Sequence, residues 1–230
     1  MQDWDSMPFG SLTIWFDRKG FRPRPWTQMQ SAWAADLLAR LPPGDLLELC
    51  AGAGHIGLLA LAEADRATGA QASSRRRLVQ VDRDATACRL AVHNAASAGL
   101  GDRVEVRQGL VEQSLAAPER FVMIIADPPW VPSRRVRDYP ENPQWAIDGG
   151  SDGLGVVRAL LPVTERHLHA TGVALLQVGG PHQVDRVQHL LQSTGSPLSV
   201  AESREAPDVH NGAVALLEQL REPTQGDSTA

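Results

Sequence analysis

The chain has 230 residues, 43% of them hydrophobic and 21% charged, and a formal net charge of −5 at pH 7. These values fit one globular domain with a single core, and the lack of a broad Lys and Arg excess argues against nucleic acid as a partner. No apolar run reaches roughly 18 residues and no signal-peptide pattern opens the chain, so we expect a cytoplasmic protein without membrane spans.

The first 44 residues are predicted to form an irregular start followed by a lid helix. Thr27 and Gln30 have the T-x-x-Q spacing of a capping box, and Pro42-Pro43-Gly44 ends the helix. Four tryptophans fall in this region, and two interpretations of them stay open: an aromatic lid over a cleft, or a cover for one edge of the core. They are Trp4, Trp15, Trp26 and Trp33.

Apolar runs and turn signals predict alternating strands and helices in the rest of the chain. Residues 65–77 lack apolar periodicity and contain Arg75-Arg76-Arg77, which predicts a solvated surface loop. The other predicted elements are a strand at 45–50, a helix from the Gly-rich turn to about 64, a strand at 78–82, a helix at 84–98, strands at 103–108 and 121–126, a helix at 155–170, a strand at 173–179, a helix at 181–193, and less regular strands near 198–203 and 212–218.

This alternation predicts an α/β fold with a parallel sheet and helices on both faces. We assign 45–221 to this domain and 222–230 to a polar tail. Ligands of such sheets bind outside the carboxyl ends of the strands, where the strand order reverses. The candidate functional residues should therefore lie at strand ends.

A glycine pattern follows the first of these strands. Gly52, Gly54 and Gly57 satisfy G-x-G-x-x-G between a predicted strand and a predicted helix, so the backbone there can approach a ligand closely. The pattern is weak alone, and Gly57 can serve only to let the helix pack on the sheet. Cys50 and Cys88 indicate neither a disulfide framework nor a metal site.

Two acids help to identify the ligand. Asp82 ends the second strand, where a carboxylate can accept from both ribose hydroxyls; the alternative is a helix N-cap, for which Asp84 is at least as well placed. Both a nicotinamide dinucleotide and S-adenosylmethionine fit these elements. Glu48 would face a pyrophosphate unfavourably but suits an ammonium and a sulfonium, which favours S-adenosylmethionine.

The tetrapeptide Asp127-Pro128-Pro129-Trp130 ends the fourth strand. Proline has no N–H, so the pair stops the strand ladder and leaves carbonyl oxygens free to point into a cleft. The Asp127 side chain and the Pro128 carbonyl can together accept two N–H bonds from one nitrogen, while the Trp130 ring can stack on a planar substrate or contact a sulfonium. A turn with a buried tryptophan is the alternative.

With these residues, the chain resembles the class I S-adenosylmethionine-dependent methyltransferases, and among them the HemK-type family that methylates a glutamine of peptide release factors. The resemblance implies a Rossmann-like seven-stranded sheet and an S-adenosylmethionine cofactor. The segments that carry it are RPRPWTQ (22–28), ELCAGAG (48–54), VDRDATACRLAVHNA (81–95), FVMIIADPPWV (121–131) and NPQWAIDGGSDGL (142–154).

The chain departs from the family pattern at three positions in the expected site. Asp127 stands where the family has Asn, Cys50 replaces the first loop glycine, and Leu110 replaces an acid that would meet the adenine amino group. A carboxylate only accepts, which favours an amino group over a carboxamide. Only a short segment precedes the matched region, where release-factor enzymes have a helical domain, and this favours a small-molecule acceptor.

We therefore expect an N-methyltransferase acting on an amide or amino nitrogen of a small molecule, a peptide-like compound or a protein glutamine, with a release factor among the candidates. A nicotinamide-dependent oxidoreductase and a catalytically silent nucleotide-binding module are the alternatives. The expected cofactor contacts are Glu48, Cys50, Gly52, Gly54, Asp82, Leu110 and Asp127, and the expected catalytic residues are Asp127, Pro128 and Trp130.

Overall fold

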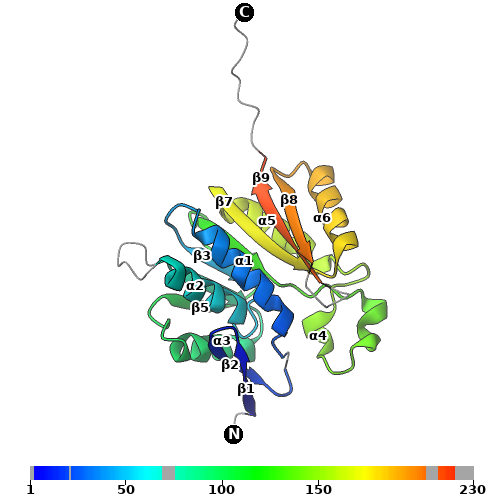
Figure 1. Cartoon of the computed structure of the whole chain (residues 1–230). Coiled ribbons are helices and arrows are strands. Elements are labelled where there is room, and N and C mark those ends of the chain that lie inside the picture. Colours follow the sequence, from blue (N-terminus) through cyan, green and yellow to red (C-terminus); the bar gives the residue numbers. More distant parts are fainter. Residues whose placement is uncertain (1–2, 21, 69–75, 206–211, 221–230) are drawn as a thin grey trace, which may run out of the picture.

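The structure is a computed structural model that describes residues 3–20, 22–68, 76–205 and 212–220. The predicted tail at 222–230 lies outside these residues. A seven-stranded sheet with the order β5-β4-β3-β6-β7-β9-β8 forms the centre of the molecule (Figure 1). Its strands are β3 (Leu46–Leu49), β4 (Leu78–Asp82), β5 (Val104–Gln108), β6 (Phe121–Ala126), β7 (Leu168–Val178), β8 (Leu198–Glu205) and β9 (Ala213–Gln219).

The order of the strands reverses beside β3. This strand pairs in parallel with β4 on one side and with β6 on the other, so the chain builds the sheet outward in both directions from this point. Only β9 runs antiparallel to its neighbours β7 and β8. The carboxyl ends of β3 and β6 therefore lie side by side at the place where α/β sheets bind ligands.

Helices cover both faces of the sheet because successive residues of a strand point to opposite faces. Leu46 and Met123 belong to one buried cluster with α1, α2 and α3, whereas Leu47 and Ile124 belong to a second cluster with α5 and α6. The predicted α/β fold is thus confirmed. The helices are α1 (Gln28–Leu38), α2 (His55–Thr68), α3 (Ala85–Ser97), α5 (Gly155–His167) and α6 (Pro181–Thr194).

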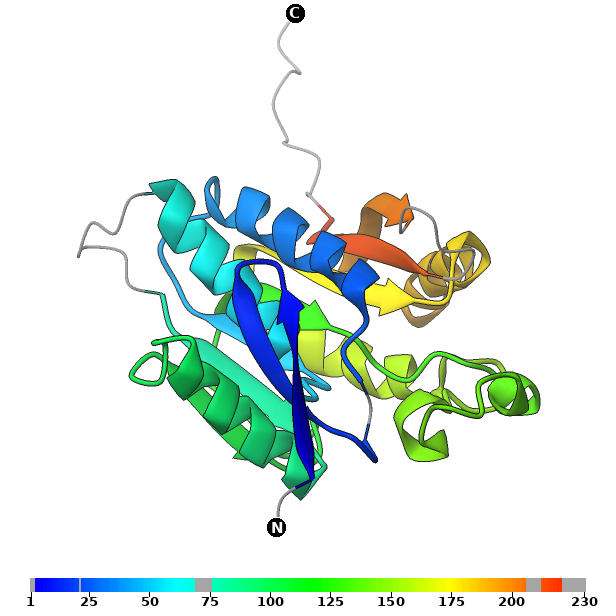
Figure 2. The ribbon, with the colours of Figure 1, turned by 60° about the horizontal axis from the view of Figure 1, so that its bottom comes forward.

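The N-terminal region is not irregular, contrary to the prediction. β1 (Trp4–Phe9) and β2 (Leu12–Asp17) form an antiparallel hairpin that lies between α3 and α1 in Figure 2. Phe9 and Ile14 are fully buried against residues of α2 and α3. The Asn94 side chain in α3 accepts from the backbone N–H of Trp15 and donates to its carbonyl. These two hydrogen bonds connect the hairpin to the sheet domain.

The predicted capping box does not form at the start of α1. Thr27 is the N-cap residue, but its side chain makes no cap hydrogen bond; its hydroxyl donates to the Arg24 carbonyl at 2.8 Å. The Gln30 amide instead donates to the carbonyl of Ala126, at the end of β6, and to that of Leu175, within β7. Tertiary hydrogen bonds thus replaced the local pattern that the sequence suggested.

The predicted loop at 65–77 is wrong at its start but holds at residues 76–77, which belong to no helix or strand. Residues 69–75 lie outside the described part. α2 continues to Thr68. The Arg76 side chain is partly buried, and its guanidinium donates to four backbone carbonyls at the end of α1 and just after it. These belong to Leu38, Leu41, Pro42 and Gly44.

The four N-terminal tryptophans do not share one role. Trp33 is 2% exposed and belongs to the core, whereas Trp26 lines the cavity described below. Trp4 and Trp15 both contact the His93 ring, with centroids 5.2 and 5.5 Å apart. Each of the two interpretations therefore fits only some of them.

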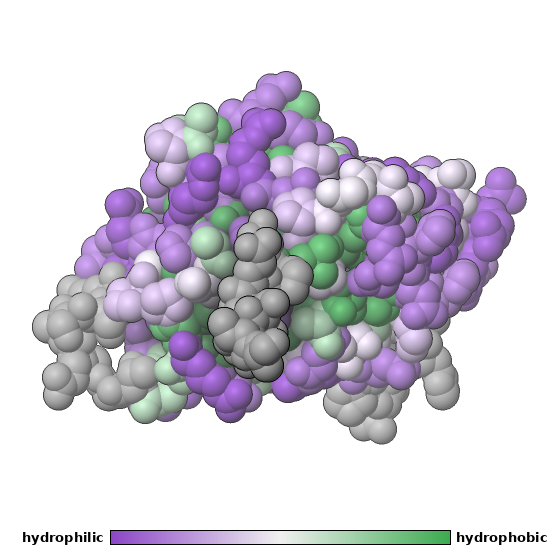
Figure 3. Space-filling view, turned by 90° about the horizontal axis from the view of Figure 1, so that it is seen from above, coloured by the Kyte–Doolittle hydropathy of each residue, from purple (hydrophilic) through white to green (hydrophobic). Residues whose placement is uncertain are grey.

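The two ends of the molecule differ in what they present. The β1–β2 hairpin and α4 (Gln144–Ile147) lie at the lower end in Figure 1. The opposite end, seen in Figure 3, is mostly hydrophilic, with hydrophobic residues gathered in a few places between polar ones. Among the described residues, no helix is both long and apolar enough to span a bilayer.

Candidate active site

A cavity of about 610 Å³ opens at the carboxyl ends of β3, β4 and β6. This volume is within the range of about 300–1,000 Å³ that is usual for small-molecule sites. Residues of the β1–β2 hairpin, the segment before α1, the Gly-rich turn and the stretch from 127 to 147 all contribute to its wall. The position agrees with the expectation from the strand order.

In the turn between β3 and α2, every second residue from 50 to 54 has a positive φ: Cys50 at 55°, Gly52 at 54° and Gly54 at 76°. A Cβ on Gly52 would meet no atom within 4 Å, so this residue borders the cavity. A Cβ on Gly54 would lie 2.5 Å from the Gln80 amide, so the absence of a side chain at Gly54 lets the turn pack against Gln80. Cys50 is the only non-glycine residue of the described chain with positive φ, which is unfavourable for a side chain.

Glu48 lies beneath this turn and does not border the cavity. It is 2% exposed. One oxygen accepts from the Gly57 backbone at 3.1 Å and the other from the Gln80 amide at 2.7 Å. Burial raises its pKa to about 7, although these two hydrogen bonds oppose the shift. The structure thus places Glu48 as a support of the loop, with the cavity on the far side of the glycines.

Asp82 lines the cavity at the end of β4. One of its oxygens accepts from the Gly52 backbone and the other from the Asp84 backbone, both at 2.8 Å. Burial raises its pKa, and the two backbone bonds oppose this. Asp84 is the actual N-cap of α3, accepting from Ala87 at 2.8 Å. Asp82 therefore joins the ends of β3 and β4 across the cavity floor.

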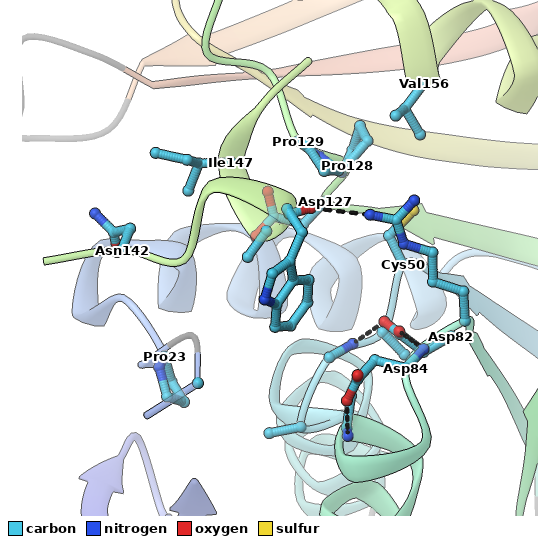
Figure 4. A pocket seen from close by; sticks show the side chains of 18 of the residues that line it. Pro23, Cys50, Asp82, Asp84, Asp127, Pro128, Pro129, Asn142, Ile147 and Val156 are labelled. Atoms are coloured by element: carbon cyan, nitrogen blue, oxygen red, sulfur yellow. Dashed lines mark hydrogen bonds between the residues drawn. The ribbon is translucent and has the colours of Figure 1, made fainter. Parts of the chain in front are cut away.

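Asp127 and Pro128 lie together at the end of β6 and border the same cavity (Figure 4). Burial raises the pKa of Asp127 to about 7, and the positive charge of Arg24 opposes this. Within the described chain no hydrogen bond reaches the Asp127 carboxylate or the Pro128 carbonyl. The carboxylate oxygens of Glu48 and Asp82 differ, because each accepts a hydrogen bond from another group of the protein.

Trp130 also borders the cavity. Its carbonyl accepts from the Gln183 amide at 3.0 Å, and its ring lies so close to Gly179 that a Cβ there would be 2.6 Å from Cε3. Leu110 lines the cavity and is 51% exposed. The cavity thus brings together all the predicted site residues except Glu48 and Gly54.

Several cavity residues were not predicted. Arg24 lines the cavity and donates to the Asn142 side chain, and it lies 3.7 Å from Glu141. Arg83 donates to the Trp145 carbonyl at 3.0 Å. Most of these residues lie in RPRPWTQ and NPQWAIDGG, two of the segments that carry the family resemblance. The resemblance could therefore have pointed to them, but it assigned no role to these individual residues.

His55 is a further wall residue that the sequence did not single out. It is 5% exposed and begins α2. Burial lowers its pKa to about 4, so its ring is neutral near pH 7. Its ring meets Phe9 edge-on at 4.9 Å and Thr27 at 3.5 Å. It joins the hairpin, α1 and α2 at one wall of the cavity.

Comparisons with known proteins show sequence similarity to two kinds of glutamine methyltransferase. No model of a protein family matches the chain. The ribosomal protein uL3 glutamine methyltransferase of Bordetella pertussis is 31% identical over 146 residues, covering 62% of this chain and 45% of that protein. The release factor glutamine methyltransferase of Cereibacter sphaeroides is 31% identical over 180 residues, covering 75% of this chain and 58% of that protein. The chain spans about half the length of the curated relatives it matches.

Solved structures share the fold at low sequence identity. The catalytic domain of hMettl16 in complex with the MAT2A 3'UTR hairpin 6 superposes with a TM-score of 0.69 at 15% identity, covering 92% of this chain and 76% of that one. The ribosomal protein L11 methylase of Lactobacillus delbrueckii subsp. bulgaricus reaches 0.60 at 12% identity, covering 89% and 84% of the two chains.

The chain has the fold of the class I methyltransferases, as the sequence predicted. Within that class, the chain is similar in sequence to the HemK-type glutamine methyltransferases, and this expectation is also confirmed.

Proposed function

We propose that the chain transfers a methyl group from S-adenosylmethionine to the carboxamide nitrogen of a protein glutamine. The observation that carries this proposal is the pair of unbonded acceptors at the end of β6: the Asp127 carboxylate and the Pro128 carbonyl in one cavity with Asp82. The names of the sequence relatives support glutamine as the acceptor.

The residues of the cavity fit the cofactor. Gly52 leaves open space above the turn, and the Asp82 carboxylate can receive ribose hydroxyls beside its two backbone donors. The charged residues on the wall are six acids and three bases, and this balance favours a cation. The acids are Asp17, Asp82, Asp84, Glu112, Asp127 and Glu141, and the bases are Lys19, Arg24 and Arg83. The bound cofactor would supply an electrophilic methyl group.

Asp127 and Pro128 would hold the acceptor nitrogen by its two N–H bonds. A carboxamide nitrogen is a poor nucleophile because its lone pair is delocalised. Bonds that draw the two hydrogens toward one wall favour a pyramidal nitrogen, and a fixed orientation supplies further acceleration. Since the Asp127 pKa is about 7, its carboxylate can also accept the proton that the methylated nitrogen releases.

A protein acceptor is favoured over nucleic acid by the charge of the wall. Phosphates would face the excess of acids at the cavity, and the chain as a whole carries a net charge of −5. Two structural neighbours are named a putative RNA methyltransferase and a tRNA m1G37 methyltransferase, but at 13% and 12% identity their likeness is one of fold. A small amino-bearing metabolite is the second candidate, because Asp127 can hold an amine with no carbonyl.

Two measurements test the proposal. Calorimetry with S-adenosylhomocysteine and with NAD should give binding for the first compound only; the reverse would identify an oxidoreductase. Mass spectrometry of a proteome from cells treated with the enzyme and deuteromethyl cofactor should then find the label on glutamine side chains. A label found only on small molecules would replace the protein acceptor by a metabolite.

A further inference from the structure

Arg24, in the segment before α1, lines the same cavity as Asp127 and Pro128. It donates to the Asn142 side chain and lies 3.7 Å from Glu141, so the loop after the Asp127 turn fixes its guanidinium. In Figure 4, Pro23 and Asn142 lie on one side of the cavity, with Asp127 and Pro128 across from them. Arg24 and Asp127 line the same cavity, and the positive charge of Arg24 lowers the pKa of the Asp127 carboxyl against the effect of burial.

The two walls have complementary hydrogen-bonding chemistry. An ionised Asp127 and the Pro128 carbonyl can only accept, whereas a guanidinium can only donate and carries five N–H groups. A carboxamide presents two N–H donors and one carbonyl acceptor within a single planar group. An Asn at position 127 would supply both a donor and an acceptor, but the carboxylate in this chain supplies no donor for the carbonyl.

We infer that Arg24 determines specificity for a carboxamide by donating to its oxygen, while Asp127 and Pro128 accept from its nitrogen. The inference rests on the proposed N-methyl transfer and names the group that the site selects. A simple amine has no oxygen that could accept from Arg24, and it would bring a second donor beside the guanidinium. The amino edge of adenine has the same donor-next-to-acceptor pattern, so adenosine belongs in the test.

A structural role for Arg24 has to be separated from this one. Arg24 holds the 141–142 loop, and its loss can change the cavity through that loop alone. Asn142→Ala removes the contact with the loop but keeps the guanidinium, so it is the matched control. Arg24→Lys keeps a charged donor, and Arg24→Met keeps an apolar stem without one.

The experiment uses the full chain, S-adenosylmethionine and a pool of synthetic peptides with one glutamine in varied flanking sequence. Ornithine versions of the same peptides and free adenosine are the comparison substrates. Methyl transfer is measured by mass spectrometry, and the best peptide is used for kcat and KM. Binding of S-adenosylhomocysteine is measured for each variant to confirm an intact cofactor site.

We expect Arg24→Met to lower kcat/KM for the glutamine peptide about 10- to 100-fold, with cofactor binding unchanged. Arg24→Lys should recover part of this loss, and Asn142→Ala should cost no more than about threefold. In an Asp127→Asn background, where position 127 again has an N–H, the effect of Arg24→Met should shrink to about threefold.

The outcomes separate the inference from the proposed function. The inference is wrong and the function stands if the enzyme methylates glutamine but Arg24→Met lowers kcat/KM by the same factor with Asn at position 127 as with Asp. The same conclusion follows if Asn142→Ala lowers kcat/KM as much as Arg24→Met does. Transfer to the ornithine peptides or adenosine without transfer to glutamine overturns both. Absence of any transfer by a chain that binds S-adenosylhomocysteine overturns both as well.

Discussion

The two halves of the cavity use acids in opposite ways. On the side of β3 and β4, each oxygen of Glu48 and Asp82 already accepts a hydrogen bond from the protein. On the side of β6, the Asp127 carboxylate and Pro128 carbonyl accept none within the described chain. In the first half, the hydrogen bonds of the acids are all made within the protein and stabilise the turn. In the second half, the acceptors are available to bind a ligand.

This difference separates residues that act through structure from those that act on a substrate. A buried acceptor without a donor costs stability, and such costs are found at functional sites. Changes in the first half should therefore lower stability, and changes at β6 should lower turnover with little loss of stability. The predictions that follow test this contrast.

The largest effect is expected for Asp127→Ala. It should lower kcat by roughly 100- to 1,000-fold, because it removes one of the two groups that hold the nitrogen. S-adenosylhomocysteine affinity, measured by calorimetry, should change by less than about threefold. Asp138→Ala, in the same region but outside the cavity wall, should have little effect on either quantity. Equal losses of turnover in the two variants would refute the assignment.

Glu48→Ala tests the scaffold half. It leaves the Gly57 N–H and the Gln80 amide without their acceptor in a fully buried place, so the free energy of unfolding should fall by about 2–4 kcal/mol. Urea titration measures this. Glu48→Gln retains one acceptor and should lose less. A stable Glu48→Ala protein with weakened cofactor binding would instead restore the direct cofactor contact that the sequence suggested.

The raised pKa of Asp127 predicts a pH-dependent gain in stability for Asp127→Asn. Its pKa is about 7 in the folded chain against 3.8 ordinarily, so between these values the folded state binds a proton that the unfolded state lacks. Stability therefore falls as the pH rises through this window. Asp127→Asn should remove the loss, with a gain on the order of 2 kcal/mol above pH 7 that shrinks toward pH 4. A gain independent of pH would contradict this cause.

The smallest effect is expected for Cys50→Gly. Its φ of 55° is unfavourable for any residue with a Cβ, and glycine would remove that strain while adding entropy to the unfolded chain. The net change should be a stabilisation of about 0.5–1 kcal/mol, visible as a higher melting temperature. Gly52→Ala, at a similar φ of 54°, should shift the temperature in the opposite direction. A large loss of stability in Cys50→Gly would show that its packing matters more than its strain.

Local sequence patterns predicted the elements of the sheet domain well. β4 and β6 begin and end at the predicted residues, because an apolar run ending at an acid is a local signal. The hairpin was missed although the Gly10-Ser11 pair between apolar residues signals a two-residue turn. Pro8 fits within β1 because the hairpin is a two-stranded sheet in which both strands are edges.

The capping box shows why other local predictions failed. Thr27 and Gln30 have the correct spacing, yet the Gln30 amide satisfies carbonyls of Ala126 and Leu175, 96 and 145 residues away. A buried carbonyl needs a donor, and no local pattern records which distant side chain will supply it. Arg76 is a second case, since it donates to four carbonyls at the end of α1 and just after it.

The sequence by itself determined the strands, the glycine turn and the position of Asp82 and Asp127 at strand ends, because these depend on local periodicity and turn chemistry. The tertiary structure decided which of the acids border the cavity: Glu48 lies beneath the turn, whereas Asp127 lines the cavity together with Arg24. That distinction depends on which donors the folded chain brings to each carboxylate, and those donors come from elements far apart in the sequence.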